Sequence, residues 1–152
     1  MYVKNKKIHA IAQMQLDMIW IYGMILANVG KEMLYTYQEC ISKYGNDYQI
    51  KKKLSEMKLF AIEKGIYSDV KYVSELEVIV KKYPDSIFTL NSAFFYHGLT
   101  DTIPSRYYLA TERGKRKITD KRVKQIFENS GELELGATQM AYNNATIRIY
   151  NK

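Results

Sequence analysis

One short stretch of this sequence combines side chains suited to contacts with phosphate and with bases. Lys51, Lys52 and Lys53 are consecutive, and Tyr48 and Gln49 come shortly before them. Lysine ammonium groups pair readily with phosphates, whereas glutamine and tyrosine can hydrogen-bond the edges of bases. The chemistry that this stretch could perform is therefore nucleic-acid binding, with affinity from the lysines and base contacts from their polar neighbours.

A first short helix is expected just before the lysines. Thr36 and Glu39 have the spacing of a capping box, in which each side chain satisfies a backbone N–H at the start of a helix. The helix should run to Tyr44 and stop at Gly45-Asn46, because glycine and asparagine adopt the left-handed conformation that ends helices at little steric cost.

The lysines themselves belong to a second predicted helix, capped by Asp47. Ile50, Leu54 and Met57 fall at positions i, i+4 and i+7, which makes one apolar stripe along that helix. The lysines lie largely away from this stripe. The solvent side of the helix is therefore expected to be cationic.

A hairpin is predicted next, with strands at residues 59–62 and 66–67 joined by a turn at 63–65 that contains a glycine. Two short helices followed by a hairpin are typical of a winged helix-turn-helix, which places its second helix in the major groove of DNA. Residues 34–70 contain no arginine, so base contacts would come from polar side chains. The expected DNA-binding residues are Asn46, Tyr48, Gln49, Lys51, Lys52, Lys53 and Lys64.

Composition indicates a globular protein with an anionic partner. The chain has 152 residues, 47% of them hydrophobic and 26% charged, and a formal net charge of +7. Cys40 is the single cysteine, which excludes an intramolecular disulfide. His9 and His97 are the only histidines, so no metal-ligand cluster is expected. We expect a cytoplasmic protein that needs no metal and no other cofactor.

Residues 1–33 are expected to form an apolar helical extension. The apolar block from Met18 to Ala27 is about half the roughly 20 residues that a bilayer requires, so no membrane span is predicted. Gln13, Gln15 and Asp17 interrupt the approach to it, which argues against a signal peptide. An apolar helix must be buried, either on the rest of the chain or against a second copy in a homodimer.

A connector helix is predicted over residues 71–83, with Val73, Leu76, Ile79 and Val80 on one face. It should end before Pro84, because the residue before a proline is biased away from helix.

Residues 84–152 are expected to form a small mixed α/β domain with a mostly antiparallel sheet. Asn91 or Ser92 would cap a short helix that ends at His97-Gly98, where the histidine serves as a structural cap. Strands are predicted at residues 106–111, 123–127, 138–141 and 146–150, the last two joined by a turn at Asn143-Asn144. The overall fold class is therefore α+β.

A second basic cluster lies between two of these strands, where residues 112–124 carry seven basic and two acidic side chains. One interpretation is a solvated strand edge, where lysines discourage aggregation. The other, which we favour, is a second anion contact, either within the same DNA footprint or serving another partner. Its members are Arg113, Lys115, Arg116, Lys117, Lys121, Arg122 and Lys124.

The same C-terminal half carries a recognisable pattern, formed by Ser92-Ala93, residues 97–101, Ile103-Pro104, Thr111 and Arg113-Gly114. This pattern resembles the one that follows the winged helix in AbiE antitoxins, the antitoxins of type IV toxin–antitoxin (abortive infection) systems. Residues 64–67 resemble the wing of that family, and residues 147–151 resemble a later strand. The resemblance covers roughly residues 35–151.

The resemblance implies a bacterial or mobile-element protein that represses its own operon and antagonises a nucleotidyltransferase-like toxin. The family usually continues into further helices after residue 151, and its N-terminal part is shorter. These two differences are therefore also compatible with a repressor that lacks full antitoxin capacity, or with a fragment of such a protein. Two alternatives stay open, a protein-interaction module without specific DNA binding and a stand-alone winged-helix transcription regulator.

An enzyme is not expected. The sequence has no nucleophile with a histidine and an acid in a suitable arrangement, and no phosphate-binding glycine loop. Pro84-Asp85 invites comparison with magnesium-dependent nucleases, but the required Glu-x-Lys on a following strand is absent, since Glu112 and Lys115 are one residue too far apart.

Overall fold

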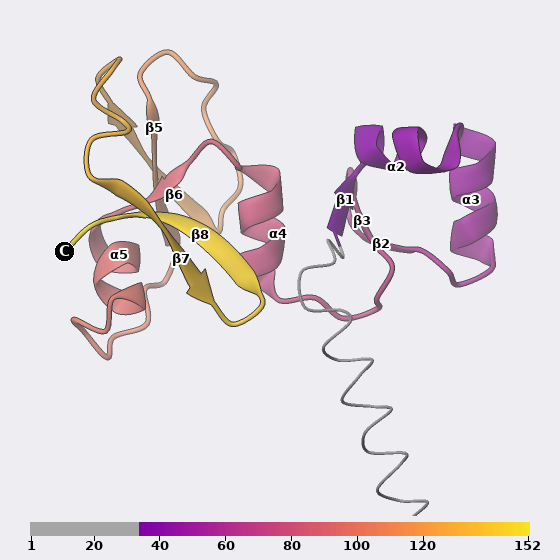
Figure 1. Cartoon of the computed structure of the whole chain (residues 1–152), viewed down its shortest axis with the longest axis horizontal. Helices are drawn as coiled ribbons and strands as arrows, with labels where there is room; N and C mark the ends of the chain where they lie inside the picture. The colour runs from indigo at the N-terminus through magenta and orange to yellow at the C-terminus, as the bar shows by residue number, and fades with distance from the viewer. Residues whose placement is uncertain (1–33) are drawn as a thin grey trace, which may run out of the picture. The chain divides into compact units, whose positions relative to one another are not determined.

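The computed structural model describes residues 34–152, which form one compact unit. The predicted apolar extension at residues 1–33, and the homodimer expected through it, lie outside the described residues. Four helices and two sheets occur in residues 34–152 (Figure 1). The predicted α+β class is confirmed.

The smaller sheet has three strands in the order β1-β3-β2, and both pairings are antiparallel. In the sequence α2 and α3 lie between the first strand and the hairpin, but in the sheet β1 lies beside β3 (Figure 1). In chain order the elements are β1 (Leu34–Thr36), α2 (Tyr37–Tyr44), α3 (Asp47–Ser55), β2 (Phe60–Glu63) and β3 (Ile66–Ser68).

The predicted capping box of α2 is present. The side chain of Thr36 accepts a hydrogen bond from the Glu39 backbone N–H at 3.3 Å, and the Glu39 carboxylate accepts one from the Thr36 N–H at 2.6 Å. Gly45 ends the helix with a φ of +92°. The cap of α3 differs from the prediction, because Asn46 Oδ1 accepts the Gln49 N–H at 3.0 Å and Asp47 is the first helical residue.

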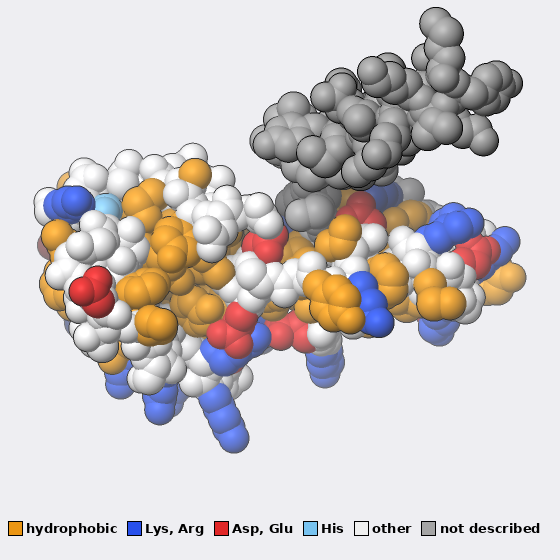
Figure 2. Space-filling model, turned by 90° about the horizontal axis from the view of Figure 1, so that it is seen from below, with side chains coloured by type: hydrophobic (Ala, Val, Ile, Leu, Met, Phe, Trp, Pro, Cys, Tyr) orange, Lys and Arg blue, Asp and Glu red, His pale blue; other side chains and the backbone are white. Residues whose placement is uncertain are grey.

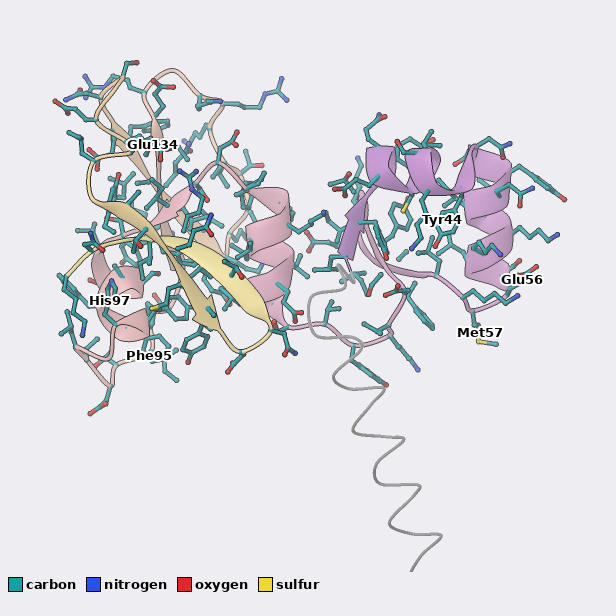
Figure 3. All side chains as sticks on the ribbon, in the orientation of Figure 1. Tyr44, Glu56, Met57, Phe95, His97 and Glu134 are labelled. Carbon is teal, nitrogen blue, oxygen red and sulfur yellow. The ribbon has the colours of Figure 1, made fainter. Side chains whose placement is uncertain are left out.

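A small core lies beneath these helices. Tyr35, Cys40, Ile50 and Leu59 are buried together, and Leu54 and Tyr44 pack against them (Figure 3). The predicted apolar stripe of α3 is wrong at Met57. The helix ends at Ser55, and Met57 has a φ of +54° and is 75% exposed.

Helix α4 (Glu75–Lys82) begins later than the predicted connector, at a Ser74 cap. It buries two faces. Leu76 and Ile79 belong to the core of the larger sheet. Val78 packs with Leu34 and Ile66 of the smaller sheet. Helix α4 therefore contributes to a separate apolar cluster on each of the two sheets.

The larger sheet has five strands in the order β6-β5-β4-β8-β7. The expectation of a mostly antiparallel sheet is wrong, because β5 pairs with β6 and β4 pairs with β8 in parallel. Residues 113–122 carry the chain back to the other end of the sheet, so that β6 runs parallel to β5. A tight hairpin would instead have made the two strands antiparallel. The strands are β4 (Ile87–Phe88), β5 (Tyr107–Glu112), β6 (Val123–Glu128), β7 (Ala137–Tyr142) and β8 (Ala145–Tyr150).

Helix α5 (Leu90–Tyr96) packs on this sheet. Its N-cap is Thr89, not Asn91 or Ser92, and Thr89 makes no side-chain capping bond. Ser92 is fully buried instead, and its Oγ accepts the Tyr108 N–H at 2.8 Å. His97 is the C-cap, as predicted, and its Nε2 lies 2.7 Å from the Tyr150 carbonyl oxygen (Figure 3).

Candidate nucleic-acid interface

Helix α3 presents one continuous exposed face. Ile50 is buried and Leu54 packs against the same core, which fixes the rotation of the helix. The positions on the opposite side have the spacing i, i+3, i+4 and i+7, so they line up along one face. They are Tyr48, Lys51, Lys52 and Ser55, all exposed.

The lysines of this face are available for a ligand. Lys51 forms an ion pair with Asp47 at 2.7 Å, and the hydrogen bond to that carboxylate raises the pKa of Lys51. Both side chains are largely exposed, and such pairs contribute little, so Lys51 can exchange Asp47 for a phosphate. Lys52 has no ion-pair partner among residues 34–152. Tyr48 is 70% exposed and supplies an aromatic ring beside them.

Three other predicted contacts differ in availability. Asn46 is exposed, but its Oδ1 is occupied by the helix cap, which leaves its amide N–H groups. Gln49 and Lys53 are half-buried at the flanks of the exposed face. Six of the seven predicted residues are therefore brought together on α3 and its N-cap, with Tyr48, Lys51 and Lys52 at the centre of the exposed face. Ser55 was missed, although its helical spacing from Tyr48 identifies it.

Lys64 belongs to a different element, the turn between β2 and β3. Its side chain is exposed. The following Gly65 has a φ of +81°, a conformation that favours glycine and lets the hairpin reverse there. Lys64 is therefore a separate positive charge on the hairpin turn, apart from the lysines of α3.

Six members of the second basic cluster are exposed. Arg113, Lys115, Arg116 and Lys117 lie at or just after the end of β5, and Lys121 and Lys124 lie near the start of β6. Figure 2 shows Lys and Arg side chains projecting along its lower edge, both from the side that holds the larger sheet and from the side that holds α2 and α3. The structure thus presents two basic regions.

Arg122, the seventh member, is engaged elsewhere. Its guanidinium donates to Asp120 Oδ2 at 2.6 Å and to Glu63 Oε2 at 2.9 Å. Lys82 Nζ lies 2.8 Å from Asp120 Oδ2 and 2.7 Å from Glu63 Oε1. The charge of Arg122 is therefore offset by carboxylates, in contrast to its six neighbours.

Arg122 Nη1 also lies 3.8 Å from Glu75 Oε2 at the start of α4, so five residues form this ion cluster, which joins the hairpin, α4 and the loop before β6. The hydrogen bonds from Arg122 hold the pKa of Asp120 well below its usual range, and the carboxylate of Asp120 in turn raises the pKa of Arg122. Burial alone would lower the pKa of Lys82, but its hydrogen bonds to Asp120 and Glu63 outweigh burial and raise it. The cluster was missed from the sequence because Glu63 lies 59 residues from Arg122.

Within residues 34–152, no helix is both long and apolar enough to cross a membrane. The same residues contain no group of three or more His, Cys, Asp or Glu side chains placed to hold a metal ion.

No protein-family model matches the sequence, and no curated protein matches it.

Proposed function

We propose that residues 34–68 form a winged helix-turn-helix that binds duplex DNA. The observation that carries the proposal is the order β1-α2-α3-β2-β3 combined with the exposed cationic face of α3. A second helix packed through one face and cationic on the other fits the major groove, and the hairpin after it corresponds to the wing.

Lys51, Lys52 and Lys64 would contact phosphates and so set affinity and its salt dependence. Tyr48 would meet base edges or sugars at the centre of the face, with the amide groups of Asn46 and Gln49 at its margin. Lysine lacks the planar fork with which arginine reads guanine. We therefore expect modest base discrimination by α3 alone.

We propose further that the protein is the antitoxin of a type IV toxin–antitoxin system, which represses its own operon and antagonises a nucleotidyltransferase-like toxin. Support comes from the resemblance to AbiE antitoxins, whose pattern falls on residues with defined roles in this fold. Ser92 accepts the Tyr108 N–H, and His97 contacts the Tyr150 carbonyl. Gly98 and Gly114 both have positive φ. The residues of the pattern therefore have structural roles in the C-terminal half of this chain.

A pair of assays tests this function. The first selects bound duplexes from a random library with the full chain and measures affinity against salt. The second asks whether the protein rescues cells that express the toxin encoded beside it. The antitoxin proposal predicts specific duplex binding and rescue. Duplex binding without rescue would leave a stand-alone regulator, and no duplex binding would leave a protein-interaction module.

The double variant Arg113→Glu/Arg116→Glu assigns the second basic region. If that region shares the DNA footprint, the variant should weaken duplex binding about as much as changes on α3. If it acts on the toxin, the variant should bind the selected duplex normally and fail to rescue cells. Normal behaviour in both assays would show that the region contributes neither to duplex binding nor to antagonism of the toxin.

A further inference from the structure

A pocket of about 390 Å³ opens on the larger-sheet side of the molecule. One wall is the turn after α4, which includes Tyr83 and Pro84, and the other is the loop that follows β5. Its volume lies within the roughly 300–1,000 Å³ of small-ligand pockets. The pocket is therefore large enough for a ligand with both a charged and a planar part.

Two cations on the loop wall are unengaged. Arg116 and Lys117 line the pocket, are exposed, and form no ion pair within residues 34–152. Lys115 lies 3.8 Å from Asp85, both of them largely exposed, which is a weak pair. Lys82 also lines the pocket, but its charge is compensated by Glu63 and Asp120. Arg116 and Lys117 are thus positioned to bind an anion, with Lys115 beside them.

The loop that carries these cations is held in place before any ligand arrives. Gln125 of β6 accepts the Ile118 N–H at 2.8 Å, and its Nε2 donates to Thr111 Oγ1 at 2.7 Å and to the Arg116 carbonyl at 3.3 Å. One side chain therefore ties the loop to both parallel strands. Preorganised donors bind more tightly because less conformational entropy is lost on binding.

The rest of the lining suits a nucleoside. Tyr83, Pro84 and Leu133 provide an aromatic ring and apolar surface, which can pack against a base. Glu112 places a carboxylate in the same lining, and an acidic side chain is the usual partner of ribose hydroxyls in nucleotide sites. A bare inorganic anion would use the cations alone and would be repelled by Glu112. We propose that this pocket binds a nucleoside phosphate, with its phosphate on Arg116 and Lys117 and its sugar on Glu112.

A nucleoside phosphate can come from two sources, a free nucleotide or the phosphorylated end of a nucleic-acid strand. The pocket is distinct from the exposed face of α3, to which none of its lining residues belongs. Binding in it is therefore independent of whether the winged helix binds duplex DNA.

The test is isothermal titration calorimetry, which measures the Kd of the full chain for ATP, GTP, AMP and inorganic phosphate at one ionic strength. A trinucleotide with a 5′-phosphate and its 5′-hydroxyl counterpart distinguish the strand end from the free nucleotide. Arg116→Glu/Lys117→Glu should raise the Kd for the best ligand at least tenfold. Gln125→Leu should do so as well without changing the net charge, because it releases the loop.

The matched control is Lys71→Glu/Lys152→Glu, which makes the same change in net charge at two exposed positions outside the lining and outside both basic regions. It should change the Kd less than twofold, and circular dichroism should show that all variants fold. Absence of nucleotide and strand-end binding would overturn the proposal. So would an equal loss in the control pair, or inorganic phosphate binding as tightly as ATP.

Discussion

Arg122→Ala should destabilise the protein through the ion cluster that joins the hairpin to the loop before β6. The substitution removes hydrogen bonds to Asp120 and Glu63 at 2.6 and 2.9 Å, along with a second bond from Arg122 Nε to Asp120 Oδ1 at 3.0 Å. It leaves two carboxylates that are only 10% and 26% exposed. Lys82 remains as their single cation among residues 34–152.

The magnitude follows from this geometry. Exposed ion pairs contribute about 0–1 kcal/mol, whereas removing one partner of a fully buried pair costs about 3–5 kcal/mol. Arg122 is 30% exposed and its partners less so, and Lys82 still compensates them in part. We therefore expect a loss of about 2–3 kcal/mol in the free energy of unfolding, measured by urea denaturation at pH 7.

Arg148→Ala is the matched control. Arg148 is 29% exposed, almost the same as Arg122, but its partner Glu134 is 68% exposed. The carboxylate left behind stays hydrated, so the loss should be below about 1 kcal/mol. Equal losses for the two variants would refute the reasoning, because burial of the partner would then not matter.

The pH dependence provides a second check on the same variant. The folded-state pKa of Asp120 is depressed below its ordinary value of 3.8, so its contribution is present above that value and is lost as the pH falls further. Without Arg122 the pKa of Asp120 should rise toward its ordinary value. The difference in stability between wild type and Arg122→Ala should therefore be largest at neutral pH and should shrink below pH 3.8. A difference that stays constant down to acidic pH would contradict this assignment.

Two further predictions concern stability. Thr36→Ala should lower the free energy of unfolding in urea by about 1 kcal/mol, because it removes the side-chain cap of α2. Thr36→Ser keeps a hydroxyl at this position and should retain most of that stability, so equal losses for both variants would mean that the capping bond is not the cause. Ile147→Ala should lower the free energy of unfolding by about 2–5 kcal/mol, because Ile147 is fully buried in the core of the larger sheet. The neighbouring Thr146 is exposed, so Thr146→Ala should change the free energy of unfolding by less than about 0.5 kcal/mol. Similar effects at both positions would contradict the orientation of β8.

Local patterns predicted the features that local interactions determine. The capping box of Thr36 and Glu39 involves residues three apart, and it is present where the sequence placed it. The turn at Asn143-Asn144 joins β7 to β8 as expected, with Asn143 at a φ of +52°. Each of these features depends on a few neighbouring residues, so the local sequence contains all the interactions that determine it.

Features that depend on distant residues were predicted less well. Nothing near β5 indicates that β6 pairs with it in parallel, because that choice is made by packing across the sheet. Arg122 looked like part of a basic surface, yet Asp120 two residues earlier and Glu63 on the hairpin offset its charge. On α3 the lysines were predicted, but the division between exposed Lys52 and half-buried Lys53 depends on how Ile50 is buried.

The measurement that tests the central proposal most directly is the salt dependence of duplex binding by Lys51→Glu/Lys52→Glu. Each lost phosphate contact should lower the slope of log K against log salt by about 0.9, so this variant should lose about 1.8 in slope and bind all duplexes more weakly. The control Lys71→Glu/Lys152→Glu makes the same change in net charge at exposed positions outside both basic regions, and it should retain the wild-type slope. An unchanged slope for Lys51→Glu/Lys52→Glu, or an equal loss in the control, would contradict the assignment of α3 as the DNA-binding helix.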